Sequence, residues 1–198
     1  SEFQRSIYGL ATGLRTDLGE FSLDWRRHNT GFSGNPPFGM DIRFVDTDVL
    51  KAGYEKAFGD VLVEASASYT DAAHGMNTFD LRPAMMQREA FAYAITRKAD
   101  IAATSPAFGG SLQIGADTAE EDHNVHVVDP GNLDNFVYSL PDIVIDRTGA
   151  FAEWTGALGA FNAELGLRVD DYDGTGGTAT FGADASMGQK MLAASYNA

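Results

Sequence analysis

Two side chains with metal-binding chemistry flank a single glycine in the segment His74-Gly75-Met76. In an extended backbone, residues two apart project to the same side, so one ion could meet both side chains. An imidazole nitrogen and a thioether sulfur form a soft donor set, which favours Cu(I) over zinc, calcium or magnesium. The pair is therefore a candidate copper site. The alternative is that a histidine and a methionine lie in one loop by chance, because so short a motif arises often.

A second pair of histidines, His123 and His126, follows the acidic run Glu120-Glu121-Asp122. A spacing of three residues would suit metal binding from one turn of a helix. No helical pattern surrounds the pair, so the segment favours a solvated acidic loop.

Three further features each have two interpretations. Met85 and Met86 offer thioether sulfurs to a copper ion, or they pack within a loop. His28 stands near the end of a predicted strand, where an interfacial position is favoured over metal binding. The run from Asp170 to Gly174 resembles half of a calcium loop but lacks the closing glutamate, so it predicts a strand that leads into an exposed loop.

Catalytic motifs are missing from the sequence. It contains no nucleophile elbow, P-loop, zinc-protease motif or glycine-rich dinucleotide fingerprint. Carboxylates are plentiful, but acids spread over loops do not identify an acid and base pair. We therefore expect no enzyme activity and no organic cofactor. A hydrolase with catalytic residues in its loops is the remaining enzymatic alternative.

Composition further narrows the possible classes of protein and partner. The 198 residues include 14 Lys and Arg, 28 Asp and Glu and no Cys, for a formal net charge of −14. The length allows one domain or two small ones. The lack of cysteine excludes disulfide scaffolds, thiolate metal sites and thiol nucleophiles. An acidic surface repels phosphate, so we expect no nucleic-acid partner.

Hydrophobicity alternates with a period of two, which is typical of two-faced strands. Phe21, Leu23 and Trp25 alternate with polar residues, and residues 161–170 repeat the pattern. Many predicted strands have about ten residues or more, and a tilted strand needs roughly 9 to 11 to cross a bilayer. The nine predicted strands lie near residues 5–14, 20–29, 43–57, 61–71, 87–98, 109–119, 146–157, 161–172 and 187–197.

The connections between these strands fall into two groups. Short links at residues 16–19, 59–60 and 158–160 are typical of tight hairpins. Long links rich in Gly, Pro, Asn and Asp are predicted at the opposite ends of the strands, at residues 30–42, 72–86, 120–145 and 173–186. Short turns at one end and long loops at the other are typical of an outer-membrane β-barrel. A soluble β-sandwich has the same alternation and is the alternative fold.

Aromatic residues near the predicted strand ends suit the two interfacial girdles of such a barrel. They are Tyr8, Trp25, Tyr54, Phe58, Tyr69, Trp154, Phe161 and Tyr172. No apolar run of eighteen residues occurs, which excludes a membrane-spanning helix but not a membrane-spanning barrel.

Longer motifs carry a family resemblance. Residues 40–48, 50–55, 149–154 and 165–170, together with His74–Arg82, resemble the TonB-dependent outer-membrane receptors, and within them the copper receptor branch. The resemblance implies an all-β fold, an antiparallel transmembrane β-barrel. It also implies that residues 1–198 form a segment of about nine strands of a larger barrel of about 22 strands, with the plug domain absent from this chain.

The same resemblance implies a role in metal uptake across the outer membrane of a Gram-negative bacterium. Copper, as Cu(I) or Cu(II), would be the transported ligand, with His74 and Met76 completed by a Cys-x-x-x-Met pair on the plug. Its other partners would be the TonB complex, reached through the plug, and outer-membrane lipid. Acidic loops with Glu120, Glu121 and Asp122 would raise the local cation concentration.

Two other functions remain open on the sequence alone. A small, complete barrel of 8 or 10 strands could serve as an adhesin or a structural anchor. A soluble β-sandwich could act as a binding module that needs no detergent.

Overall fold

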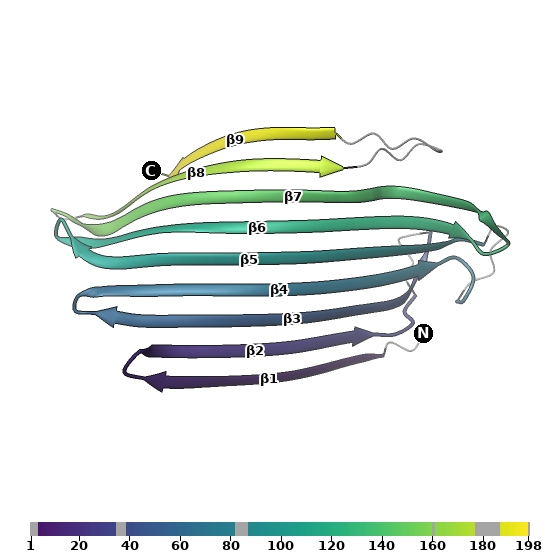
Figure 1. Cartoon of the computed structure of the whole chain (residues 1–198), viewed down its shortest axis with the longest axis horizontal. Helices are drawn as coiled ribbons and strands as arrows, with labels where there is room; N and C mark the ends of the chain where they lie inside the picture. Colours follow the sequence, from purple (N-terminus) through teal and green to yellow (C-terminus); the bar gives the residue numbers. More distant parts are fainter. Residues whose placement is uncertain (1–3, 35–38, 82–86, 160, 177–186, 198) are drawn as a thin grey trace.

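The computed structural model describes residues 4–34, 39–81, 87–159, 161–176 and 187–197. They form a single antiparallel sheet in which each strand pairs with its neighbours in the sequence, in the order β1 to β9 (Figure 1). The strands are β1 (Arg5–Thr16), β2 (Gly19–Thr30), β3 (Asp41–Phe58), β4 (Val61–Asn77), β5 (Glu89–Ala107), β6 (Gly110–Asp129), β7 (Asn132–Leu158), β8 (Phe161–Gly176) and β9 (Met187–Asn197).

Tight turns join the strands in pairs at one end of the sheet, on the left in Figure 1. Gly59, Gly109 and Gly159 have φ of 65°, 74° and 65°, the left-handed region that glycine adopts without steric cost. Two-residue hairpins require such residues because only these turns match the twist of the flanking strands. The predicted short links at 16–19 and 59–60 are confirmed, and Phe108–Gly109 forms one that was not predicted. The predicted link at 158–160 includes residue 160, which lies outside the described residues.

The number, order and antiparallel pairing of the strands match the prediction, but several strands are longer than predicted. Residues 72–77 belong to β4, and residues 120–129 and 132–145 belong to β6 and β7. The long loop predicted at 120–145 is therefore wrong, because two strands joined at residues 130–131 occupy it. Polar residues occur on both faces there, so the sequence shows no alternation of polar and apolar residues, although the hydrogen-bonded pairing of the strands continues.

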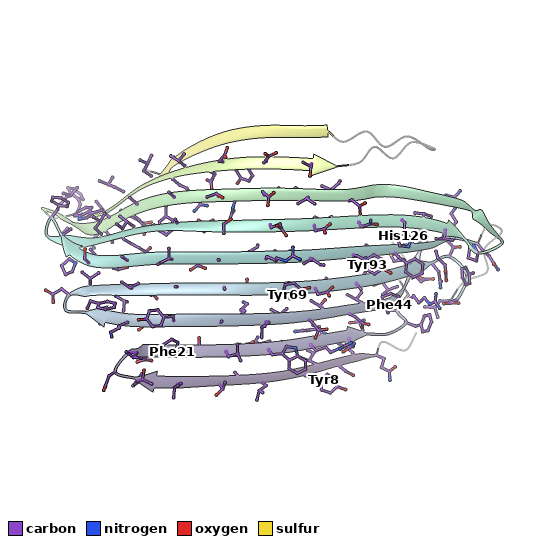
Figure 2. The ribbon with its side chains drawn as sticks, viewed as in Figure 1. Tyr8, Phe21, Phe44, Tyr69, Tyr93 and His126 are labelled. Carbon is purple, nitrogen blue, oxygen red and sulfur yellow. The ribbon has the colours of Figure 1, made fainter. Side chains whose placement is uncertain are left out.

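Away from the bulges, the register assigns the strand residues named below to one of two faces, because directly opposed residues of antiparallel strands share a face. Figure 2 shows the described side chains along the strands. We call one face the polar face; it carries Glu64, Ser66, Ser68, Asp100, Asp117 and Arg168. The other is the apolar face, which carries Phe21, Leu23, Ile101, Ile114, Leu165 and Leu167.

The apolar face has no covering layer among the described residues. Ile101 is 54% exposed and Leu167 60% exposed, and Ala119 is the only buried hydrophobic residue that the described chain contains. A β-sandwich would bury these side chains against a second sheet. The sandwich alternative is therefore wrong, and so large an apolar surface requires a partner such as lipid. Strands β1 and β9 lie at opposite edges, so these strands do not close a small barrel among themselves.

A row of charges borders the apolar face on the side away from the tight turns. Arg97 pairs with Glu120 and lies over the ring of Tyr69, and Arg27 lies 3.6 Å from Asp48. We call this row, with Asp71, the ionic belt. Between the turn at Gly59 and the belt, β4 runs from Val61 to Tyr69. This is about the length that a tilted strand needs to cross a bilayer, roughly 9 to 11 residues.

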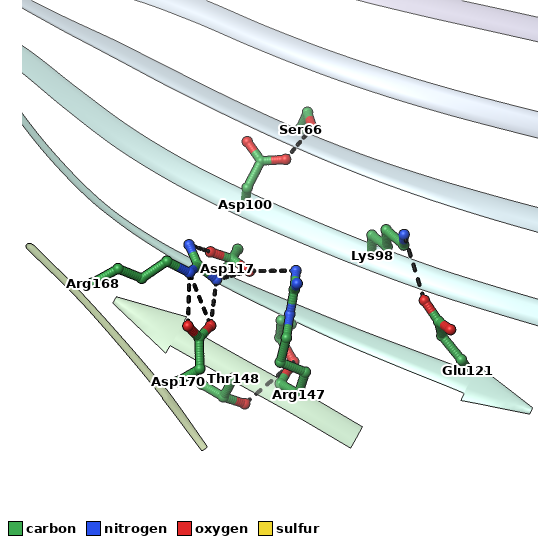
Figure 3. Close-up of polar contacts among 10 residues, drawn as sticks. Ser66, Lys98, Asp100, Asp117, Glu121, Arg147, Thr148, Arg168 and Asp170 are labelled. Atoms are coloured by element: carbon green, nitrogen blue, oxygen red, sulfur yellow. Dashed lines mark hydrogen bonds and ion pairs between the residues drawn. The ribbon is translucent and has the colours of Figure 1, made fainter. Parts of the chain in front are cut away.

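Charged side chains link three strands across the polar face (Figure 3). From β8, Arg168 reaches over β7 and donates to Asp117 of β6, with Nη1 2.7 Å from Oδ2. The same guanidinium holds Asp170, with Nε 2.9 Å from Oδ1, while Arg147 Nη2 lies 2.8 Å from Asp117 Oδ1. A Cβ at Gly149 would lie 2.5 Å from Asp170 Oδ1, so glycine leaves the room that this crossing needs.

A pair of arginine substitutions tests which face meets lipid. Ile101→Arg places a charge near the middle of the apolar face and should lower the free energy of unfolding from lipid vesicles by about 2–4 kcal/mol. Ala102→Arg, one residue further on the polar face, should change it much less. Urea titration of the protein in vesicles gives both values. Equal costs would contradict the assignment of the faces.

A second prediction concerns the charged residues that link β6, β7 and β8. Arg168→Ala leaves Asp117 and Asp170, which is 7% exposed, without their main cation. The free energy of unfolding should fall by about 1–2 kcal/mol, because an unpaired, largely buried carboxylate is costly. Arg15→Ala is the matched control, since its pair with Glu20 is well exposed and such pairs contribute little. A control as destabilised as Arg168→Ala would contradict the cluster's role.

Candidate metal-binding site

His74 and Met76 occupy alternate positions near the end of β4 that lies beyond the ionic belt. The register places them on the polar face, in line with Glu64, Ser66 and Ser68 of the same strand. The prediction that the two side chains share one side is confirmed. They do not lie in a loop, as predicted, but in a paired strand, so the ladder fixes the spacing between them.

Small and aliphatic residues surround the pair on the neighbouring strands. His74 is opposite Val45 of β3 and Ala92 of β5, and Met76 is opposite Ile42 and Ala90. The two alanine side chains on β5 are small and nonpolar. Among the described residues, no hydrogen bond or ion pair to the His74 ring is present.

Local backbone irregularity accompanies the pair. The register between β3 and β4 shifts between Ile42 and Phe44, which leaves Arg43 as the extra residue of a β-bulge opposite Gly75 and Met76. On the apolar side, the Phe44 ring lies over Gly75; a Cβ there would come within 2.9 Å of its Cδ1. Because Gly75 has no Cβ, the Phe44 ring can pack against the apolar side of β4 at this position.

This arrangement offers two donors to an ion. An imidazole nitrogen and a thioether sulfur on one strand face suit a soft, low-coordinate ion such as Cu(I). Elsewhere in the described chain, no group of three or more His, Cys, Asp or Glu residues could hold a metal. A complete coordination shell would need further donors besides this pair.

The second histidine pair does not share one face of the sheet. His123 and His126 lie in β6, not in a loop, and a spacing of three places them on opposite faces of the strand. His123 lies on the polar face, 3.7 Å from Glu121. His126 lies on the apolar side, stacked on Phe91. The two histidines therefore do not share a helical turn, and the predicted loop is wrong because the segment belongs to β6.

The acidic run is likewise divided between the faces. Glu121 lies on the polar face, 3.6 Å from Lys98, whereas Glu120 and Asp122 lie on the other side, where Glu120 pairs with Arg97. The expectation that all three belong to an external loop is therefore wrong. Within the run, Glu121 alone faces the same side as His74.

The remaining candidates have structural roles or lie outside the described residues. His28 lies on the polar face of β2, with Nδ1 3.4 Å from Arg5 Nη2. Asp170–Gly174 continues β8, and Asp170 binds Arg168 instead of forming a calcium loop. Met85 and Met86 lie outside the described residues.

Two clusters were not predicted from the sequence. One is the cluster of Asp117, Arg147, Arg168 and Asp170 on the polar face. The other is a group of rings, Phe44, Phe91, Tyr93 and His126, on the far side of the ionic belt. Alternation gives the face of each residue, but only the register brings these residues into neighbouring rows.

Comparisons with known proteins agree with this architecture. The described residues form no helix that is long and apolar enough to cross a membrane. No curated protein matches the chain. Among solved structures, "Copper transporter OprC" is similar, with a TM-score of 0.77 and 22% identity over 97% of this chain and 34% of that one. The chain thus spans about a third of that protein.

The family model described as "TonB dependent receptor-like, beta-barrel" matches residues 2–197, nearly the whole chain. A sheet of long antiparallel strands, with an uncovered apolar face and a charged opposite face, has the architecture of a barrel wall. The chain therefore belongs to the TonB-dependent receptor family and forms part of its transmembrane β-barrel.

Proposed function

We propose that this chain forms part of the wall of an outer-membrane receptor that imports copper, with His74 and Met76 as ligands for the ion. One observation carries the proposal: the two soft donors lie at alternate positions of β4 on the polar face, which lines the lumen of a barrel. The chain would act as a transporter and would not change its cargo chemically.

The donor chemistry supports copper over harder cations. Imidazole and thioether ligands select Cu(I), whereas calcium and magnesium take oxygen ligands. The similar solved structure bears the name of a copper transporter, but at 22% identity the likeness reaches the fold alone. Copper therefore rests on the residues of this chain.

The membrane location follows from the apolar face and the backbone. Within a bilayer every backbone N–H and C=O must be paired, and a closed barrel of antiparallel strands does this without a free edge. The apolar face between the tight turns and the ionic belt would lie against lipid of the outer membrane of a Gram-negative bacterium. The polar face would border water.

Uptake would then take three steps. A cation enters from outside along a surface whose net charge is −14 over the sequence, which raises its local concentration. His74 and Met76 bind it together with ligands from a plug domain outside this chain. Energy passed from the inner membrane by the TonB complex rearranges the plug and lets the ion pass. The paired strands stay rigid throughout.

Copper titration of the whole receptor tests the ligand pair. His74→Ala and Met76→Ala should each weaken Cu(I) binding by roughly tenfold or more, because each removes one inner ligand. Met76→Leu, which keeps the size but removes the sulfur, should behave like Met76→Ala. His28→Ala is the matched control: it removes a histidine from the polar face and should leave the affinity unchanged.

Unchanged Cu(I) affinity in both alanine variants would remove the pair from the site. Equal affinity for Zn²⁺ and Cu(I) in the wild-type receptor would argue against a soft site.

Transport itself can be measured in cells. Copper accumulation through the receptor should disappear in a strain without TonB, because the plug would not be rearranged. The receptor should still bind Cu(I) when isolated from that strain. Copper uptake that continues at the same rate without TonB would contradict the proposed energy coupling.

A further inference from the structure

The two candidate ligands lie close to the end of β4 that is away from the tight turns, on the right in Figure 1. β4 ends at Asn77, and its pairing with β3 and β5 ends there too, opposite Asp41 and Glu89. Met76 is the residue before Asn77. Hydrogen bonds near the end of a strand open more readily than those in its middle. Further contacts are therefore needed to keep Met76 in a fixed position.

An ion pair crosses the end of β4 on the side of the sheet opposite Met76. Arg43, the extra residue of the bulge in β3, donates from Nη1 to Oε1 of Glu89 in β5 at 2.6 Å. Glu89 is opposite Asn77 in the register, so it lies on the face that Met76 does not occupy. The Glu89 side chain is 18% exposed, and water screens such a partly buried pair less than an exposed one. The pair thus joins β3 directly to β5.

The side chain of Asn77 closes the same end of the strand from within. It is 1% exposed, and Asp41 opposite it is 2% exposed. Its Oδ1 accepts from the backbone N–H of Phe79 at 3.3 Å and of Asp80 at 3.1 Å, while its Nδ2 donates to the Asp80 carboxylate. Such an Asx turn determines the path of the chain as it leaves the sheet. The turn begins one residue after Met76.

We call Arg43, Asn77, Asp80 and Glu89 the polar clamp. We propose that the polar clamp positions Met76 for ion binding, with Arg43 and Asn77 as its positioning residues. This inference rests on the ligand pair in the proposed function. The clamp residues do not touch the ion, because the ion pair and the buried amide lie on the opposite side of the sheet from the thioether. They act through the backbone of β4.

The chemistry of methionine explains why the backbone must be held. Its side chain is unbranched and has three rotatable bonds, so the sulfur meets an ion at a defined place only if the strand beneath it does not move. If the strand end is paired in only a fraction of molecules, the apparent affinity for the ion falls by that fraction. His74 lies two residues further inside the ladder and depends less on the clamp.

Cu(I) titration of the whole receptor tests the clamp. Asn77→Ala removes the Asx turn, and Arg43→Ala removes the contact between β3 and β5. Each should weaken Cu(I) binding by roughly tenfold, the size of effect typical for groups that orient metal ligands. The Arg43 side chain is 41% exposed, so Arg43→Ala should fold even if Asn77→Ala does not.

X-ray absorption of the copper-loaded variants separates positioning from a general loss of stability. Sulfur scattering around the ion should fall in Arg43→Ala as it does in Met76→Leu, because the thioether is displaced. The nitrogen contribution of His74 should remain. A variant that is only less stable would bind the ion with the same set of neighbours as the wild type.

Two further variants serve as controls. Arg43→Lys keeps a cation that can reach Glu89 and should restore most of the affinity and the sulfur signal. Asn29→Ala removes another Asn–Asp hydrogen bond from the same side of the sheet, in which Nδ2 lies 2.8 Å from Oδ1 of Asp46. That bond joins only β2 to β3, so Cu(I) affinity should not change.

Three outcomes would overturn the proposal. They are an unchanged Cu(I) affinity in both alanine variants, a loss of affinity with the sulfur signal of the wild type, and an equal loss in Asn29→Ala. A wild-type receptor that binds no Cu(I) would overturn the proposed function together with this inference. Wild-type binding that depends on His74 and Met76 but not on the clamp would overturn this inference alone.

Discussion

A single layer of strands cannot stabilise itself by a core, and this constraint shapes every other feature of the chain. Backbone pairing between consecutive strands holds the sheet together, while its apolar face needs an environment outside the chain. The polar face must in turn satisfy its charges within one layer. Arg168 does so by crossing β7 to Asp117, a contact that ties β6 to β8 where no second sheet could help.

The same ladder positions the candidate ligands. His74 and Met76 need no loop to bring them together, because alternate residues of a paired strand already share a face. Their neighbours on β5, Ala90 and Ala92, have small nonpolar side chains. The bulge at Arg43 adjusts only the strand behind them. In the proposed function, the barrel wall would supply fixed donors, and the movement would belong to the plug domain.

The sequence predicted the strands correctly where one face meets lipid, because polar and apolar residues alternate there. It failed to predict strand structure where this alternation is missing. Residues 20–29 and 161–170 alternate because one face meets an apolar medium, so their strands were found. In residues 120–129, charged residues such as Glu120 and Glu121 occur on both faces, so the segment resembles a loop in sequence, although β6 continues through it. Asp117 and Arg168 are 51 positions apart, and only the full register brings them together. The pairing of His74 with Met76 was predictable because it depends on two neighbouring positions of a single strand.

β4 continues without a break past Tyr69 to Asn77. Whether the number of residues between Tyr69 and His74 is odd or even therefore decides which face His74 and Met76 occupy. Inserting or deleting one residue between Tyr69 and His74 would move the imidazole and the thioether to the opposite face of the sheet. A change of two residues would keep them inside and only move them along the barrel axis. Relatives that differ in the length of this strand should therefore differ by even numbers wherever the ligand pair is retained.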